Sequence, residues 1–153
     1  MRLAEALEWR RKIRRLGAKL VFTNGCFDLL HRGHAEYLLD ARKLGDYLVV
    51  AINSDASVRA IKGPSRPVVN QDDRAFLLAS FAFVDAVVIF AGRRCTNLIR
   101  DLKPDIYAKG GDYTISTIDS IEKTVLLKAG TDIEFVKFKE GFSTTGIIRK
   151  VRN

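Results

Sequence analysis

Two histidines, His31 and His34, are the only two in the chain, and they stand three residues apart. They belong to the segment GCFDLLHRGH (25–34), where an apolar run gives way to a helical pattern. A spacing of three places both imidazoles on one side of a helical turn. The start of a helix attracts anions through its free N–H groups, and Gly33 lets a phosphate approach the backbone closely. The segment therefore predicts a phosphate clamp, and the alternative is a histidine pair that only packs the turn.

Three hydroxyl residues in succession form a second candidate group. Ser143, Thr144 and Thr145 follow Gly141 at the start of a predicted final helix. Capping of the helix explains one of them, because a Ser or Thr at a helix start accepts a backbone hydrogen bond. Three in succession at the predicted ligand edge suggest added hydrogen bonds to phosphate oxygens at the same helix start, with capping alone as the alternative.

Several charged residues stand near the same segments. Lys43, Lys62, Arg66 and Lys109 are candidate phosphate ligands, with simple solvation as the alternative for each. Lys109 is the best placed of the four, because it ends a predicted strand beside two glycines. Asp28 is expected to cap the following helix or to orient a histidine, and capping is the commoner role.

A metal site held by the protein is not expected. A His-x-x-His pair is half of a zinc site, but zinc needs one or two further His or Cys ligands. The chain has no third histidine, and Cys95 lies in a different connection. Magnesium carried mainly by nucleotide phosphates is compatible with these residues.

The periodicity of the apolar residues predicts strands that alternate with helices, which implies a parallel sheet. The fold expected is an α/β, Rossmann-like, doubly wound five-stranded parallel sheet in a single domain (1–153), with an N-terminal helix in 1–17. Ligands of such folds bind beyond the carboxyl ends of the strands, here loops 23–34, 53–67, 109–115 and 139–145. The expected helices are 3–16, 32–43, 72–82, 94–102, 117–129 and 144–151, and the expected strands are 20–22, 47–52, 86–90, 105–108 and 133–138.

Composition restricts the partners and the compartment. The net charge of +8 favours an anionic partner such as a nucleotide, a sugar phosphate or a nucleic acid. The basic run 10–15 raises nucleic-acid or membrane-surface binding as a minor alternative, although such helix faces are usually just solvated. Two lone cysteines, no stretch of about 18 apolar residues and no signal-like start predict a cytoplasmic protein without a membrane span.

The segment GCFDLLHRGH matches the His-x-Gly-His signature of the cytidylyltransferase-like nucleotidyltransferases, and the resemblance runs through almost all of the chain from about residue 20. Within that superfamily, the chain most resembles the adenylyltransferases that make ADP-glycero-manno-heptose from heptose 1-phosphate. The shared segments are FTNGCFDLLHRGH (22–34), ARKLGD (41–46), NSDASVR (53–59), KGPSRPV (62–68), VDAVV (84–88), KGGDYT (109–114) and FSTT (142–145).

This resemblance implies that ATP, with Mg²⁺ on its phosphates, and a sugar 1-phosphate give an ADP-sugar and pyrophosphate. It also implies a homodimer, a separate kinase that supplies the sugar phosphate, and a role in lipopolysaccharide or related glycans. The catalytic residues implied are His31, His34, Lys43, Ser143 and Thr144. The nucleotide-binding residues implied are Thr23, Asn24, Gly25, Cys26, Phe27, Asp28, Gly33, Lys109, Gly110, Gly111, Asp112 and Thr145. The acceptor-binding residues implied are Asn53, Asp55, Lys62 and Arg66.

Two segments depart from the heptose family. Gly92-Arg93-Arg94-Cys95 replaces an acidic Asp-Thr-Pro-like segment, and the stretch 115–128 is also less familiar. Both are expected to border the acceptor pocket or an oligomer contact. The glycerol-3-phosphate cytidylyltransferases are the second candidate family. Phe138 in place of their arginine, and Gly-Gly-Asp in place of Gly-Asp-Asp, favour adenine and heptose instead.

Overall fold

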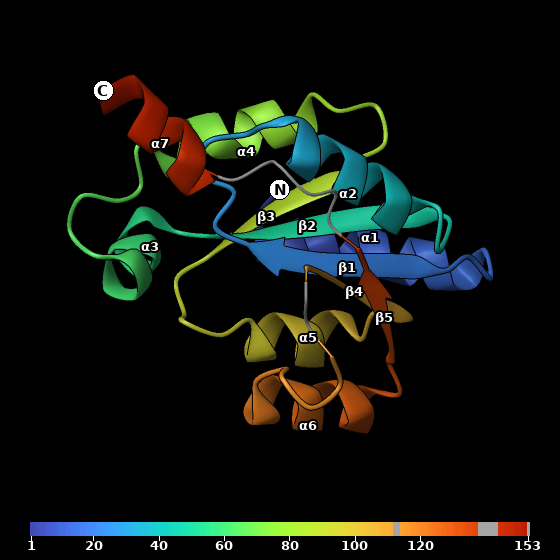
Figure 1. Ribbon diagram of the computed structural model, residues 1–153. Coiled ribbons are helices and arrows are strands. Elements are labelled where there is room, and N and C mark those ends of the chain that lie inside the picture. Colours follow the sequence, from blue (N-terminus) through green and yellow to red (C-terminus); the bar gives the residue numbers. More distant parts are fainter. Residues whose placement is uncertain (112–113, 138–143, 153) are drawn as a thin grey trace.

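The structure is a computed structural model, and it describes residues 1–111, 114–137 and 144–152. Strands and helices alternate along the chain, as Figure 1 shows. The helices are α1 (Leu3–Arg15), α2 (Arg32–Arg42), α3 (Asp55–Lys62), α4 (Gln71–Ala79), α5 (Thr96–Leu102), α6 (Ser120–Ala129) and α7 (Thr144–Arg152). The strands are β1 (Leu20–Gly25), β2 (Tyr47–Asn53), β3 (Ala86–Phe90), β4 (Ile106–Gly110) and β5 (Asp132–Val136).

The five strands form one parallel sheet in the order β3-β2-β1-β4-β5. The chain builds outward from β1 to β3 and then crosses to the other side of β1 for β4 and β5. The switch point therefore lies between β1 and β4, where ligands of doubly wound folds bind. The predicted five-stranded doubly wound sheet is confirmed.

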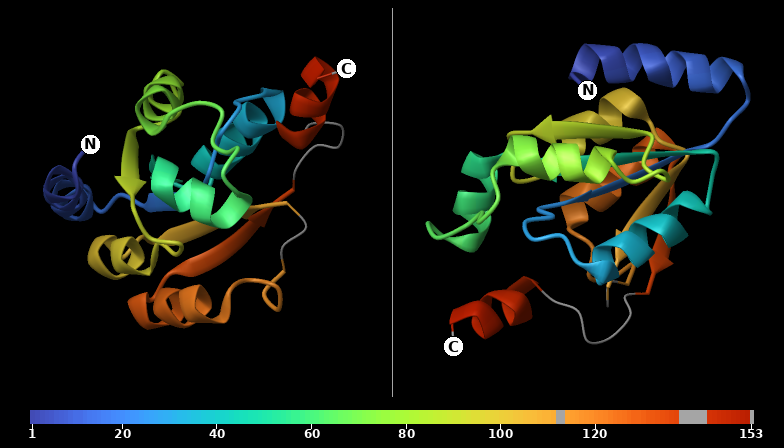
Figure 2. Two further views of the ribbon diagram at one scale, coloured as in Figure 1. Left: turned by 90° about the vertical axis from the view of Figure 1, so that its left-hand side faces the viewer. Right: turned by 90° about the horizontal axis from the view of Figure 1, so that it is seen from above.

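Each face of the sheet carries its own hydrophobic core. Leu20 and Phe22 of β1 belong to a cluster with α1, α5 and α6, whereas Val21 packs on the other face with residues of α2 and α4. Figure 2 shows these two layers of helices on opposite sides of the sheet. Because successive strand residues point to opposite faces, strands buried on both sides must be apolar throughout, which explains their unbroken apolar runs.

Helix α1 is fastened to the sheet by one residue of the basic run. Arg10 is 3% exposed, and its Nε donates to the carbonyl of Leu102 over 3.0 Å. Its Nη2 donates to the carbonyl of Lys103 over 2.8 Å, and its Nη1 lies 3.0 Å from a carboxylate oxygen of Asp105. Arg10 is thus a buried structural residue. It does not belong to the exposed basic face, solvated or anion-binding, that the sequence predicts for residues 10–15.

The structure corrects two elements at the ligand-binding edge. Strand β1 does not stop at Phe22 but continues to Gly25, which pairs with Ile52 of β2. Residues 55–62, predicted as part of a loop, form helix α3. Ser54 caps the start of this helix, because its hydroxyl oxygen accepts from the backbone N–H of Ser57 over 3.3 Å. Helix α3 has only eight residues, so the helical period of its apolar positions repeats too few times to be recognised in the sequence.

The remaining boundaries differ by a few residues. Helix α6 begins at Ser120 rather than 117, because Asp119 accepts from the backbone N–H groups of Ile121 and Glu122. Strand β5 ends at Val136, and Phe138, the expected strand end, lies outside the described residues. Within the described part of the chain, no helix has the length and apolar character needed to cross a membrane.

Candidate active site

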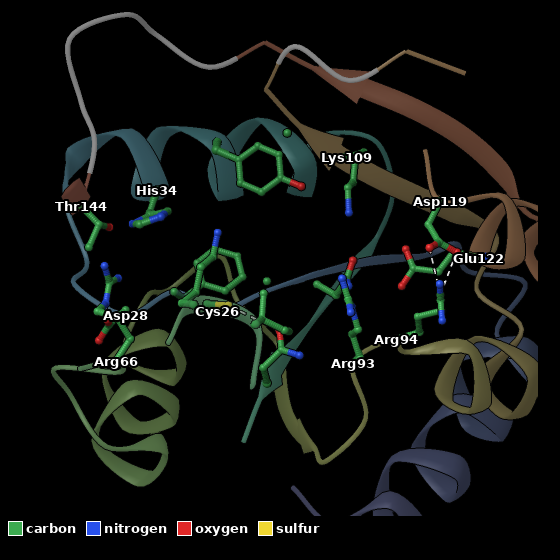
Figure 3. Close-up of a pocket in the computed structure, with 18 of the residues that line it drawn as sticks. Cys26, Asp28, His34, Arg66, Arg93, Arg94, Lys109, Asp119, Glu122 and Thr144 are labelled. Carbon is green, nitrogen blue, oxygen red and sulfur yellow. Dashed lines mark hydrogen bonds and ion pairs between the residues drawn. The ribbon is translucent and has the colours of Figure 1, made fainter. Parts of the chain in front are cut away.

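A cavity of about 520 Å³ lies at the carboxyl ends of β1, β2 and β4. Figure 3 shows its lining residues, with His34 and Thr144 on one side and Arg93, Arg94 and Asp119 on the other. The predicted site residues that line it are Asn24, Gly25, Cys26, Phe27, Asp28, His34, Asn53, Lys62, Arg66, Lys109, Gly110, Thr144 and Thr145. The topology therefore brings together residues from all four of the predicted ligand loops.

The histidine pair stands at the start of α2. His31 is the residue before the helix, and its carbonyl accepts from the backbone N–H of His34 over 2.9 Å. The two imidazoles stack with centroids 3.9 Å apart, and Phe27 packs against His34 at 5.3 Å. His34 lines the cavity, whereas the predicted residue His31 does not and contacts it only through the stacked ring of His34. The predicted juxtaposition of two imidazoles and a helix start is present in the fold.

The electrostatics of the pair favour uncharged rings. Burial, followed by the charge of a protonated His31, lowers the pKa of His34 to about 4. Burial also lowers the pKa of His31. A neutral imidazole keeps one N–H donor, so the pair offers hydrogen bonds to an anion without needing a proton from solution.

Asp28 does not cap α2 or orient a histidine. Its buried carboxylate forms an ion pair with Arg66 and accepts the backbone N–H groups of Val68 and Val69 over 2.7 and 3.0 Å. The helix instead starts at His31 without any side-chain cap. Asp28 therefore ties the segment 66–69 to the β1–α2 loop, and it holds Arg66, a predicted phosphate ligand, at the cavity.

The ends of β1 and β4 are joined by hydroxyl groups beneath the cavity. Thr23 does not line it but is fully buried, with its hydroxyl 2.6 Å from the Tyr37 hydroxyl, which in turn donates to the Ala108 carbonyl over 3.0 Å. The hydroxyl of Tyr107 donates to Asn24 over 2.7 Å and accepts from Lys109 Nζ over 3.2 Å. These bonds hold Asn24 and Lys109 at the switch point.

Arg74 is a buried residue that the sequence analysis missed. It is fully buried on α4, and its guanidinium donates to the carbonyls of Cys26, Asn53 and Val69. It also pairs with Asp55 at 2.8 Å, so Asp55, a predicted acceptor ligand, is engaged below the cavity rather than lining it. The single signal in the sequence was an arginine inside an otherwise amphipathic helix pattern.

The loop after β3 and the start of α6 also contribute lining residues that the sequence analysis did not name as site residues. Arg93, Arg94, Asp119 and Glu122 all line the cavity. The Nε atom of Arg94 lies 2.9 Å from both carboxylate oxygens of Asp119. All four residues lie in the segments 92–95 and 115–128, where the sequence departs from the heptose family. These departures were the signal in the sequence, and both segments border the cavity.

Three further predicted residues lie outside the cavity lining. Lys43 follows the last residue of α2 and pairs with Asp40 at 2.7 Å, about 14 Å along the helix from His34 at 1.5 Å per residue, and it does not line the cavity. Gly33 is buried in the first turn of α2. Gly111 has a positive φ of 96° directly after β4, which suits glycine. Asp112 and Ser143 lie outside the described residues.

Thr144 connects the C-terminal helix to the histidine loop. It is the first residue of α7, and its hydroxyl donates to the carbonyl of Leu29 over 3.4 Å. Thr145 lines the cavity beside it. Figure 1 shows α7 beyond the carboxyl ends of the strands, near the start of α2. The two threonines thus lie on the same side of the cavity as His34.

The acidic residues do not assemble a metal centre. Among the described residues, no group of three or more His, Cys, Asp or Glu side chains is placed to hold a metal ion. Asp28 is engaged by Arg66 and two amides, and Asp119 by Arg94 and the start of α6. The described part of the cavity therefore presents mainly donors, which suits an anionic ligand.

Comparison with known proteins agrees with this geometry. The family model described as cytidylyltransferase-like matches residues 22–150. The bifunctional protein HldE of Syntrophotalea carbinolica is 49% identical over 138 residues, which is 90% of this chain and 28% of that protein. Its counterpart from Geotalea uraniireducens is 51% identical over 136 residues, covering 89% of this chain and 27% of that protein.

The chain thus spans under a third of the length of these curated relatives. A solved structure, the lipopolysaccharide core biosynthesis protein from Thermoplasma volcanium, has a TM-score of 0.67 and 28% identity, and the match covers 82% of this chain and all of that one. A matching family model across the sheet, together with the histidine pair at the switch point, shows that the chain belongs to the cytidylyltransferase-like family of nucleotidyltransferases.

Proposed function

We propose that the chain transfers a nucleotidyl group from ATP to a sugar 1-phosphate, D-glycero-β-D-manno-heptose 1-phosphate, giving ADP-heptose and pyrophosphate. The observation that carries this proposal is His34 at the start of α2, stacked on His31 and lining a cavity that Lys62, Arg66 and Lys109 also line. Helix N–H groups, imidazoles and cations together suit a polyphosphate. The names of the relatives, bifunctional HldE and a lipopolysaccharide core biosynthesis protein, support the heptose acceptor.

The chemistry needs positioning more than acid–base catalysis. A phosphate oxygen of the acceptor forms a bond to the α-phosphorus, and the bond from that phosphorus to the bridging oxygen breaks in line, so pyrophosphate leaves with the electron pair. The attacking oxygen is already ionised at neutral pH, so no base is required. The protein holds both phosphates and stabilises the charge that spreads over the reacting oxygens.

Each set of residues has a role in this proposal. His31 and His34 donate hydrogen bonds to the α- and β-phosphates, and Thr144, Thr145 and Ser143 to the β- and γ-phosphates. Lys109 offers a charge at the end of β4. Cys26 stays a neutral thiol, because burial raises its pKa, and so it serves as lining rather than as a nucleophile.

Magnesium enters this proposal as a substrate component. The described carboxylates are engaged by basic side chains and amides, so they fit a metal centre poorly, and Mg²⁺ would arrive on the triphosphate. A separate kinase activity would supply the sugar phosphate, since the bifunctional relatives are more than three times as long as this chain. We also propose a homodimer in the cytoplasm, as the resemblance implies.

One substrate matrix tests the function. Pyrophosphate release is measured with ATP, CTP, GTP and UTP, each crossed with heptose 1-phosphate, hexose 1-phosphates and glycerol 3-phosphate. We expect turnover with ATP and heptose 1-phosphate above all other pairs. Turnover with CTP and glycerol 3-phosphate alone would replace this function with that of a glycerol-3-phosphate cytidylyltransferase, and no turnover with any pair would refute nucleotidyl transfer.

A further inference from the structure

The backbone of the loop between β3 and α5, residues 91–95, is fastened to the rest of the cavity wall. The carbonyl of Gly92 accepts from Asn53 Nδ2 over 3.2 Å and from the Ser57 hydroxyl over 2.8 Å. At the other end of the loop, the backbone N–H of Cys95 donates to the buried Glu122 over 3.3 Å. Anchors at both ends hold the two arginines between them in a defined place.

The two arginines differ in what neutralises them. Arg94 is paired with Asp119, with its Nε 2.9 Å from each carboxylate oxygen. Arg93 has no hydrogen bond or ion pair to any residue in the described ranges, although it lines the cavity. Figure 3 shows its guanidinium directed into the cavity, toward the side on which Lys109 lies and across from His34 and Thr144. A fixed loop thus presents to a ligand one guanidinium that forms no ion pair within the described residues.

The neighbours of Arg93 determine which anion suits it. Asp119 and the 5%-exposed Glu122 line the same end of the cavity. Asp119 is already paired with Arg94, and Glu122 accepts from the amide of Cys95, so this end of the cavity carries no excess negative charge. The carboxylate oxygens can accept further hydrogen bonds from hydroxyl groups, which a triphosphate chain does not offer. A guanidinium binds a phosphate through a bidentate hydrogen bond. Together with the two carboxylates, it therefore suits a phosphomonoester that also bears several hydroxyl groups.

We propose that Arg93 binds the phosphate of the acceptor and that Asp119 and Glu122 accept hydrogen bonds from its hydroxyl groups. This end of the cavity is then the acceptor subsite for a polyhydroxylated phosphomonoester. The proposal rests on the proposed function, because the histidine end is assigned there to the triphosphate. In-line transfer requires the two phosphates to meet from opposite sides, which agrees with the placement of Arg93 across the cavity from His34.

The test compares Arg93→Ala and Arg93→Lys with Arg59→Ala, an exposed arginine of α3 that does not line the cavity. Removing a charged donor from a phosphate should raise KM for the sugar phosphate about 10- to 100-fold and leave KM for ATP within about twofold. In Arg93→Lys, the rise in KM for the sugar phosphate should be smaller, because lysine keeps the positive charge but cannot form the bidentate hydrogen bond of a guanidinium. Arg59→Ala should behave as wild type.

A second measurement separates this proposal from the proposed function. Titration calorimetry follows heptose 1-phosphate binding to wild type and to Arg93→Ala with a non-hydrolysable ATP analogue present. Weaker binding by the variant supports the subsite even if wild type turns over another nucleotide. A rise in KM for ATP alone would assign Arg93 to the nucleotide instead. Unchanged constants for both substrates, or equal binding of the sugar phosphate by both proteins, would overturn the proposal.

Discussion

At His34, burial and a neighbouring ring determine whether the side chain carries a charge. Burial first, and then His31, lowers the pKa of His34 to about 4, so the ring is neutral at neutral pH. The positive charge at the cavity must then come from Lys62, Arg93 and Lys109 and from the start of α2. The imidazoles contribute directed hydrogen bonds, which is the contribution that positioning demands.

Replacing either imidazole should therefore reduce catalysis more than folding. His34→Ala and His31→Ala should each lower kcat/KM by about 10²–10³, the scale for losing one charge-stabilising donor. His34→Asn keeps an N–H donor and should lose less. Steady-state kinetics and melting curves on the three variants check this, and near-normal turnover in both alanine variants would show that the pair only packs the turn.

The lowered pKa of His34 also makes a prediction about acid stability. The unfolded chain takes up a proton on His34 near pH 6.5, whereas the folded chain does not until about pH 4. The unfolding free energy of wild type should therefore fall as the pH drops from about 6.5 to 4. Urea titrations of wild type and His34→Asn across this range measure the effect. Other groups titrate in both wild type and His34→Asn, so wild type should lose more unfolding free energy than the variant. An equal loss in the two proteins would contradict the lowered pKa of His34.

At the scale of elements, two buried ion pairs determine how the loops meet. Asp28 on the β1–α2 loop holds Arg66, and Arg74 on α4 holds the carbonyls at the ends of β1 and β2 together with Asp55. These contacts join elements on either side of α3, the helix that the sequence analysis missed. They hold the two ends of α3, so that Lys62 and Arg66 lie at the cavity.

Loss of the Arg74 guanidinium should destabilise the packing of α4 against the carboxyl ends of β1 and β2. Arg74→Met leaves Asp55 and three carbonyls without their donor, so the unfolding free energy should fall by about 3–5 kcal/mol. Arg59→Met, an exposed arginine on α3, should change it by no more than about 0.5 kcal/mol. Urea unfolding of the two variants gives the comparison. A loss below 1 kcal/mol in Arg74→Met would mean that the loops are held by other contacts.

At the scale of the whole molecule, α1 lies apart from the candidate active site, because none of its residues lines the cavity. Helix α1 packs on the face of the sheet that carries α5 and α6, and its residues precede the matched family region 22–150. The buried Arg10 joins it to the α5–β4 turn. The bond to Arg10 and the amide of Leu20 outweigh burial and lower the pKa of Asp105, so this carboxylate is charged at neutral pH.

Weakening this attachment should lower stability while leaving catalysis intact. Arg10→Met removes buried donors to two carbonyls and a carboxylate, with an expected cost of about 1–3 kcal/mol. The kcat of the folded protein should stay unchanged, because none of these atoms lines the cavity. Arg11→Met, on the exposed face of α1, serves as the control. If kcat fell in Arg10→Met below the melting transition, α1 would be coupled to the site.

Much of the fold and part of the site could be predicted from local patterns. The unbroken apolar runs of β2 and β3 predict buried parallel strands, and the three-residue spacing of His31 and His34 predicts two imidazoles on one side of a helix start, which the structure shows as stacked rings. Both features depend on neighbours within a few residues. Lys43 shows the limit of this reasoning, because it shares a helix with His34 but lies at its far end, paired with Asp40.

The sequence by itself determined the alternation of strands and helices, the doubly wound sheet and the histidine pair, because hydrophobic period and turn residues are local properties. Only the tertiary structure decided which charges are neutralised and which remain for a ligand. Arg94 meets Asp119 across 25 residues, Arg66 meets Asp28 across 38, and Arg10 meets Asp105 across 95. Such pairs form only where crossover connections bring distant loops together. The same packing left Arg93, next to Arg94 in the chain, directed into the cavity.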